Sequence, residues 1–183
     1  LHLLPIASLF ALLAFCTLIV IAVYDLRHQI IPDLLVALFA IIALVNFFWK
    51  TGFERAFDMP YVWTLIAGPI LFFPFWALWM VSGGRWIGLG DGKLSLGIGW
   101  FLGATLGGSA VILGFWIGAA FALLVMSVQR LALLRNFFRV GTSQKLSFQS
   151  EIPFGPFLIL GVFIVYFTHV NFFDGTVTFF SLL

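Results

Sequence analysis

The sequence has very little charge. Asp, Glu, Lys and Arg make up 9% of the residues, while 63% are hydrophobic and the mean hydropathy is +1.17. Few water-soluble domains are so apolar. The net charge of +2 is too small to suggest a nucleic-acid partner. The composition therefore favours one polytopic membrane domain over residues 1–183, in contact with lipid and with no second soluble domain.

Cysteine is almost absent as well, and the usual metal and nucleophile motifs are missing. The single thiol, Cys16, lies in an apolar run, cannot form an internal disulfide and has no CxxC partner to bind zinc. His2, His28 and His169 do not cluster at metal-ligand spacing. The chain also lacks GxSxG, HExxH and a P-loop. We therefore expect no metal and no cofactor.

What the sequence does have is long uncharged runs. A bilayer core needs about 20 apolar helical residues. The run Leu94–Gln129 would form a helix of about 54 Å, too long for one crossing. The cluster Gly107-Gly108-Ser109 predicts a turn that divides it. The expected fold is all-α, with six membrane-spanning helices at about 3–24, 34–49, 61–82, 94–106, 110–129 and 154–173.

The first run, Leu3–Tyr24, has no basic residue before it and is longer than the apolar core of about 7–15 residues in a signal peptide. We therefore expect it to be a membrane span.

The basic residues are divided unevenly between the two sides of this arrangement. One set of loops holds Arg27, Arg85, Lys93, Arg130, Arg135, Arg139 and Lys145, and the other holds Lys50 and Arg55. The positive-inside rule places the first set in the cytoplasm. We expect a multi-pass protein of the cell (inner) membrane with Asp25, Asp33, Asp91 and Glu151 on its cytoplasmic side. The segment 130–145 fits either an interfacial helix or a plain loop.

Of the seven acidic residues, four have ordinary explanations. Glu54, Asp58, Glu151 and Asp174 occupy loops or chain ends, where exposed charges normally carry no chemistry. Asp25 is different, because it closes an apolar run at a helix C-terminus, where the helix dipole disfavours a carboxylate. A residue placed against its local preference is a candidate for function.

Two further acids begin predicted helices. Asp33 follows Pro32 and is well placed to act as an N-cap. Asp91 lies among glycines in "GLGDGK", residues 88–93. Capping explains an aspartate there, but it does not explain Gly88 and Gly90, which permit the close approach of another chain. Lys93 fits a membrane anchor or a functional role.

Asp25 and Asp91 lie on the same predicted membrane face but on different helices, so packing can bring them together. Two neighbouring carboxyl groups cannot both ionise cheaply, so one keeps its proton. The charged partner can then take a proton from water while the neutral one polarises a carbonyl. This is the chemistry of an aspartyl protease.

The three stretches "YDLRHQIIPD" (24–33), "GLGDGKL" (88–94) and "IPFGPF" (152–157) together resemble the type IV prepilin peptidases. The resemblance implies a GxGD-type membrane aspartyl endopeptidase that cuts the basic leader from type IV prepilins or pseudopilins at the cytoplasmic face. It implies that Asp25 and Asp91 are the catalytic pair.

The same resemblance assigns supporting positions. Lys93 matches the lysine of GxGDxK, and Pro32 and Asp33 close the D-x7-D stretch. Pro153, Gly155 and Pro156 match a turn before the last span. From the residues alone, that turn is also explained as a helix start, since proline is favoured in the first turn.

The chain departs from the family in one respect, and other interpretations stay open. Full-length bacterial members usually carry an N-terminal span and a cytoplasmic domain linked to N-methylation, which nothing in the chain matches, so we expect no methyltransferase activity. Archaeal preflagellin peptidases share the six-span plan. Presenilin relatives have a PAL motif and more spans. A non-enzymatic transporter or assembly protein is a further alternative. The sequence leaves the substrate and the oligomeric state open.

Overall fold

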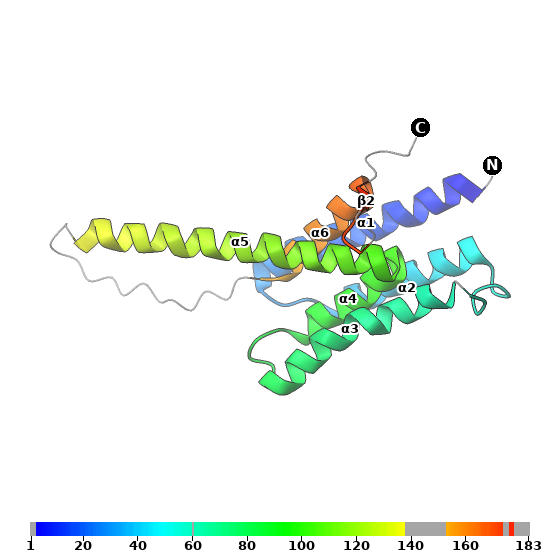
Figure 1. Ribbon diagram of the computed structural model, residues 1–183, viewed down its shortest axis with the longest axis horizontal. Coiled ribbons are helices and arrows are strands. Elements are labelled where there is room, and N and C mark those ends of the chain that lie inside the picture. The colour runs from blue at the N-terminus through cyan, green and yellow to red at the C-terminus, as the bar shows by residue number, and fades with distance from the viewer. Residues whose placement is uncertain (1–2, 60, 138–152, 174–175, 178–183) are drawn as a thin grey trace.

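Six helices make up most of the computed structural model, which describes residues 3–59, 61–137, 153–173 and 176–177 (Figure 1). Its side chains are described over residues 6–59, 61–128 and 153–173. The helices are α1 (Leu3–His28), α2 (Asp33–Thr51), α3 (Val62–Ser82), α4 (Leu89–Leu102), α5 (Ala104–Phe137) and α6 (Gly155–Thr168). The predicted all-helical class is confirmed, apart from a small hairpin in which β1 (Val170–Asn171) pairs antiparallel with β2 (Thr176–Val177).

Four stretches of helix in the described part of the chain are long and apolar enough to cross a membrane. They are Ile6–His28, Asp33–Thr51, Val62–Ser82 and Ala104–Val128. The helices α4 and α6 have 14 residues each. At about 1.5 Å per residue each is shorter than a hydrocarbon core of about 30 Å. The chain is a membrane protein by these features, while six crossings remain a prediction.

The predicted turn at Gly107-Gly108-Ser109 is wrong. The chain breaks instead at Gly103, whose φ of 82° and ψ of 180° are open essentially to glycine alone. Gly107 and Gly108 lie inside α5, where they allow close packing. A Cβ would lie 2.9 Å from Leu71 Cδ1 at position 107 and 2.9 Å from Phe173 at position 108.

Three other predicted boundaries also change. The helix α4 begins at Leu89 instead of residue 94, so it contains both Asp91 and Lys93. The helix α5 continues unbroken to Phe137, so residues 130–137 form no separate interfacial helix, and residues 138–145 lie outside the described residues. The last helix ends at Thr168, where His169 adopts the left-handed conformation with φ 51°.

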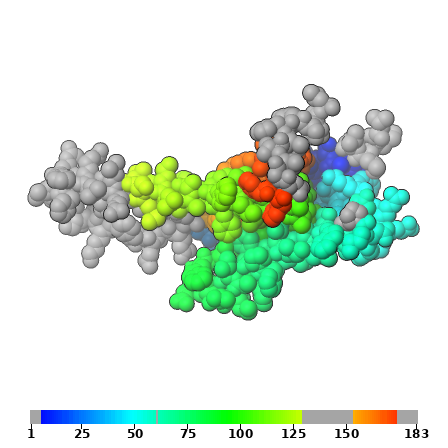
Figure 2. All heavy atoms as spheres, in the orientation of Figure 1, coloured from blue at the N-terminus to red at the C-terminus, as the bar shows by residue number. Residues whose placement is uncertain are grey.

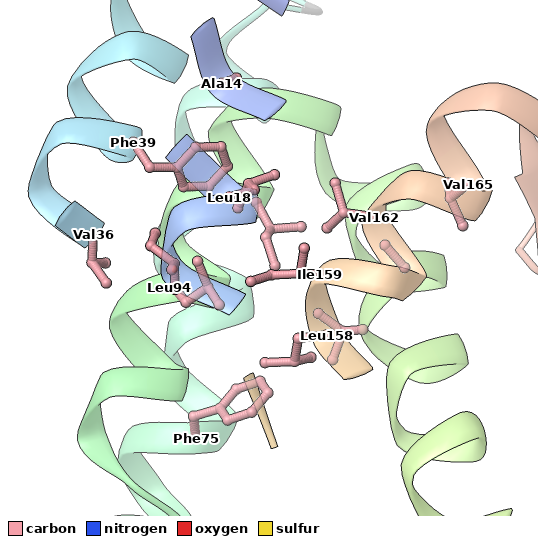
Figure 3. Close-up of a cluster of buried hydrophobic side chains, with 14 residues drawn as sticks. Ala14, Leu18, Val36, Phe39, Phe75, Leu94, Leu158, Ile159, Val162 and Val165 are labelled. Carbon is pink, nitrogen blue, oxygen red and sulfur yellow. The ribbon is translucent and has the colours of Figure 1, made fainter. Parts of the chain in front are cut away.

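The core forms where α1, α2, α4 and α6 meet. Leu18, Phe39, Leu94 and Leu158 belong to one buried cluster, drawn from these four helices in that order (Figure 3). The helix α4 approaches its neighbours closely because it is rich in glycine. A Cβ at Gly99, for example, would lie 2.6 Å from the backbone carbonyl of Ala67 on α3. Small residues allow this close approach between membrane helices.

The helix α5 is much longer than the body that it packs against. It extends past the other helices at one end of the molecule (Figure 1), and the space-filling view shows the same projection (Figure 2). The C-terminal ends of α1 and α3 and the N-terminal ends of α4 and α6 lie toward that end (Figure 1). The next section describes the cavity that they surround.

Candidate active site

Asp25 lies in the last turn of α1, where its side chain is only 3% exposed. The backbone N–H of Gly155, the first residue of α6, donates a hydrogen bond to its carboxyl group. Its Oδ2 is buried and accepts no hydrogen bond from the described residues. A Cβ at position 155 would lie 2.6 Å from that oxygen, so the start of α6 meets Asp25 closely because residue 155 is glycine.

Asp91 is the third residue of α4 and is 8% exposed. The helix cap is Gly88, whose backbone N–H donates to the Asp91 carboxyl group. This contact is the reciprocal half of a capping box, in which the third helical residue reaches back to the cap. Capping therefore explains one hydrogen bond to the Asp91 carboxyl group, but it leaves the other oxygen unexplained. Its Oδ1 is buried and accepts nothing from the described residues.

The structure brings these two carboxyl groups together. Asp25 and Asp91 line one cavity of about 880 Å³, and they are close enough for their charges to repel each other. Among the described residues, no group of three or more His, Cys, Asp or Glu side chains is arranged to hold a metal ion. The arrangement offers two buried acids that line one cavity, and each has a carboxyl oxygen that accepts no hydrogen bond from the described residues.

The capping interpretation of Asp33 is wrong. The cap of α2 is Pro32, whose carbonyl accepts the N–H groups of Leu35 and Val36 at 3.1 and 3.2 Å, and Asp33 makes no capping bond. Instead Asp33 Oδ1 accepts a hydrogen bond from Lys93 Nζ at 2.7 Å. This ion pair joins the start of α2 to α4 at the cavity, but the Asp33 side chain is 73% exposed, so the pair adds little stability.

The glycines beside Asp91 accommodate the protein's own chain. A Cβ at Gly90 would lie 3.0 Å from Ile31 Cβ, in the connection between α1 and α2, and one at Gly92 would lie 3.1 Å from Phe75 Cβ on α3. These glycines let the α1–α2 connection and α3 pack against the first turn of α4. Their small size thus helps to place Asp91 near Asp25.

The predicted turn before α6 also reaches the site. Phe154 caps α6, Gly155 and Pro156 are its first two residues, and Pro153 lines the cavity. Pro156 occupies a first-turn position where its missing N–H costs nothing. The turn is therefore a helix start, as the residues alone suggest, and it also supplies the N–H that holds Asp25.

One wall of the cavity was missed from the sequence. It is formed by α5, through Phe115, Gly118, Ala119 and Ala122. These positions are spaced three, four and seven residues from the first, so they share one helix face. The signal is present in the sequence, but in a uniformly apolar helix nothing distinguishes a face that lines a cavity from one that faces lipid. Arg85 and Trp86, in the α3–α4 connection, also line the cavity and were not singled out.

The fold and the site define an all-helical membrane protein with two buried carboxyl groups facing one open cavity. The sequence profile of the type IV leader peptidase family matches residues 12–124, more than half of the chain, and the chain belongs to this family. It is thus a leader-peptidase-like protease. The matched region contains Asp25 and Asp91, while the turn at 153–156 lies beyond it. No curated protein and no solved structure matches the chain significantly.

Proposed function

We propose that this protein is an aspartic endopeptidase that removes the basic leader from type IV prepilins or pseudopilins, with Asp25 and Asp91 as its catalytic pair. The observation that carries the proposal is the convergence of these two buried carboxyl groups, from α1 and α4, on one cavity. Membership of the leader peptidase family supplies the peptide-cleaving activity. The geometry supplies the residues that can perform it.

The reaction follows from two acids that share one proton. The charged carboxylate takes a proton from a water molecule as the water oxygen attacks the scissile carbonyl carbon. The neutral carboxyl group donates its proton toward the carbonyl oxygen, which balances the developing charge. Collapse of the tetrahedral intermediate breaks the C–N bond, and the amine leaves with a proton from the dyad. The Gly155 N–H holds Asp25 in position throughout.

The distribution of charge supports cleavage at the cytoplasmic face. Arg85 and Lys93 line the cavity, and the end of α5 that carries Arg130 and Arg135 projects from the same end of the molecule (Figure 1). By the positive-inside rule this end faces the cytoplasm. A basic leader would then stay in water while the apolar segment behind it stays in the membrane.

The first test replaces each catalytic acid by its amide. Asp25→Asn and Asp91→Asn keep the shape of the side chains but cannot share a proton, so each should lower leader cleavage at least about 100-fold. The assay uses the purified protein in liposomes with a prepilin and, separately, an archaeal preflagellin as substrates. Thermal melting in detergent shows whether each variant remains folded.

Two controls make the same chemical change elsewhere. Asp58→Asn lies in the exposed α2–α3 connection, away from the cavity lining, and should cleave like the unaltered protein. Asp33→Asn, at the edge of the cavity, removes the charge from the exposed pair with Lys93 but keeps an oxygen that can accept its hydrogen bond, and should retain appreciable cleavage. Normal processing by a folded Asp25→Asn or Asp91→Asn variant would rule out the proposed dyad.

A further inference from the structure

A second, smaller cavity lies between the C-terminal ends of α2 and α4 and the start of α3. It has a volume of about 260 Å³ and is lined by residues that include Asn46, Lys50, Tyr61, Thr64 and Phe101. These helix ends lie away from the projecting end of α5 (Figure 1). No residue that lines the active-site cavity lines this one, so the proposed proteolysis does not explain it.

Asn46 is a buried polar residue inside the apolar run of α2. Its side chain is only 4% exposed, and its Oδ1 accepts no hydrogen bond from the described residues. A buried acceptor without a donor is costly, so such groups normally have a partner. Polar side chains within membrane helices usually mark a function. Because Asn46 lines the cavity, a ligand with an O–H or N–H group can supply the missing donor there.

Lys50 lies one turn further along α2, on the same helix face as Asn46. It is the only charged residue in the cavity lining, and it forms no ion pair with an acidic residue of the described chain. Its place in the last turn of α2 is favourable for any cation, because of the helix dipole. A lysine that is exposed and lacks an acidic partner can also bind an anion in the cavity.

The aromatic residues around this cavity indicate the level of the lipid headgroups. Trp49, Tyr61 and Trp63 are exposed at the same ends of α2 and α3. Tryptophan and tyrosine are enriched where the hydrocarbon core meets the headgroups. Phe47 and Phe101 give the cavity apolar walls. A ligand that fits these surroundings has an anionic group, a hydrogen-bond donor and an apolar part.

We propose that this cavity binds the headgroup of an anionic phospholipid that carries free hydroxyl groups, of which phosphatidylglycerol is the simplest. Lys50 holds the phosphate, and a headgroup hydroxyl donates to Asn46 Oδ1. The end of α4 offers further acceptors, because the last carbonyl groups of a helix have no partner within it. A choline headgroup has no donor for Asn46, and an ethanolamine headgroup brings a second positive charge close to Lys50. The bound lipid joins α2, α3 and α4 at the end opposite the active site.

Thermal melting of the purified protein in a non-ionic detergent tests this site. Phosphatidylglycerol, phosphatidylcholine, phosphatidylethanolamine and inorganic phosphate are added separately at equal concentration. Since a ligand of the folded state raises the melting temperature, we expect phosphatidylglycerol to raise it by about 4 °C or more, and each other addition by less than about half as much. An equal rise with another lipid would indicate lipid contact without a specific site, and an equal rise with inorganic phosphate would indicate a free anion. Either result, or no rise at all, would overturn the proposal.

Asn46→Leu separates a lipid site from a structural role of the amide. Because the amide oxygen has no partner in the described chain, an apolar side chain of similar size should keep or raise the melting temperature without lipid. The same variant should lose most of the shift caused by phosphatidylglycerol. A clear fall in the lipid-free melting temperature would instead assign Asn46 to the packing of the protein and contradict the site.

Lys50→Gln and Arg55→Gln form a matched pair. Both residues are exposed on the same side of the molecule and each change removes one positive charge, but only Lys50 lines the cavity. Lys50→Gln should lose at least about half of the phosphatidylglycerol shift, and Arg55→Gln should retain it. Equal shifts in the two variants would show that the lipid responds to net charge and not to this cavity.

Retention of lipid provides a second measurement that involves neither unfolding nor a substrate. In native mass spectrometry, the unaltered protein and Arg55→Gln should carry a bound phosphatidylglycerol molecule, and Lys50→Gln should have lost it. Equal retention by all three proteins would contradict the proposal. Because no cleavage is measured, these results stand apart from the test of Asp25 and Asp91.

Discussion

At the scale of single residues, Gly155 is the supporting position with the tightest geometry. A Cβ there would lie 2.6 Å from Asp25 Oδ2, closer than real Cβ contacts come. Gly155→Ala must therefore displace either the carboxyl group or the start of α6. Because a misplacement of about 1 Å can cost about 100-fold in rate, we expect cleavage to fall at least about tenfold. The measurement is kcat for leader cleavage, with thermal melting of the same sample.

Gly161 provides the comparison for this prediction. A Cβ at position 161 would collide with the carbonyl oxygen of Ala110 on α5, so Gly161→Ala should destabilise the packing of α5 on α6. Gly161 does not line the cavity, and activity per folded molecule should survive. If both variants lost activity only in proportion to their stability, Gly155 would have no special relation to Asp25.

Single residues also show where local sequence signals mislead. Asp33 after Pro32 has the pattern of a capped helix start, yet its partner is Lys93, 60 residues away in the chain. Asp91 has the sequence pattern of a helix cap, and the hydrogen bond that its carboxyl group accepts from the Gly88 N–H confirms part of that interpretation. No local rule identifies an ion pair between two distant helices, because it depends on how the helices pack.

At the scale of elements, Gly103 ends α4 in a conformation that suits glycine. We expect Gly103→Ala to destabilise the protein by about 1–3 kcal/mol, the usual cost of a residue held in a sparsely populated backbone region. No atom lies within 4 Å of a Cβ built there, so the cost would come from the backbone alone. The free energy of unfolding in detergent micelles measures it.

Gly108→Ala is the control, because the sequence pattern predicts the turn at Gly107-Gly108-Ser109 instead of at Gly103. Residue 108 is helical, and alanine is a better helix former than glycine. Its closest contact would be the edge of the exposed Phe173 ring, 2.9 Å away, and Leu71 Cδ2 would lie at an ordinary 3.9 Å. The variant should therefore be less destabilised than Gly103→Ala. The opposite order would mean that the chain breaks where the sequence suggests and not at Gly103.

The helices themselves could be predicted far better than their junctions. Uncharged runs mark α1, α2, α3 and α6 within a few residues, because a membrane helix must be apolar along its length. Between α4 and α5, glycine signals both turns and close packing. Gly107 packs against Leu71 and Gly103 makes the turn, a difference that depends on neighbours from α3. The face of α5 that lines the cavity was missed from the sequence because it, too, is defined by the helices that pack around it.

At the scale of the whole molecule, the site lies at the end that carries most of the described basic residues. Among the described residues, five basic residues belong to the connections and helix ends on the side of the cavity, namely Arg27, Arg85, Lys93, Arg130 and Arg135, and two, Lys50 and Arg55, belong to the other side. Large apolar side chains are exposed around the helices, as expected of a surface that faces lipid, with Leu12 61% and Trp63 56% exposed. In the proposed orientation, with the basic end in the cytoplasm, the active site would meet a leader in water without placing its acids deep in hydrocarbon, where charges are costly.

This orientation predicts which loops a reagent outside the cell can reach. In a Cys16→Ser background, Arg55→Cys in the α2–α3 connection and Arg85→Cys in the α3–α4 connection are both exposed and remove the same charge. A membrane-impermeant maleimide should label position 55 on intact cells, and position 85 only after permeabilisation. Labelling of 85 from outside, with 55 protected, would place the two carboxyl groups on the side away from the leader. Cleavage at the cytoplasmic face would then be impossible, whatever the purified enzyme does in liposomes.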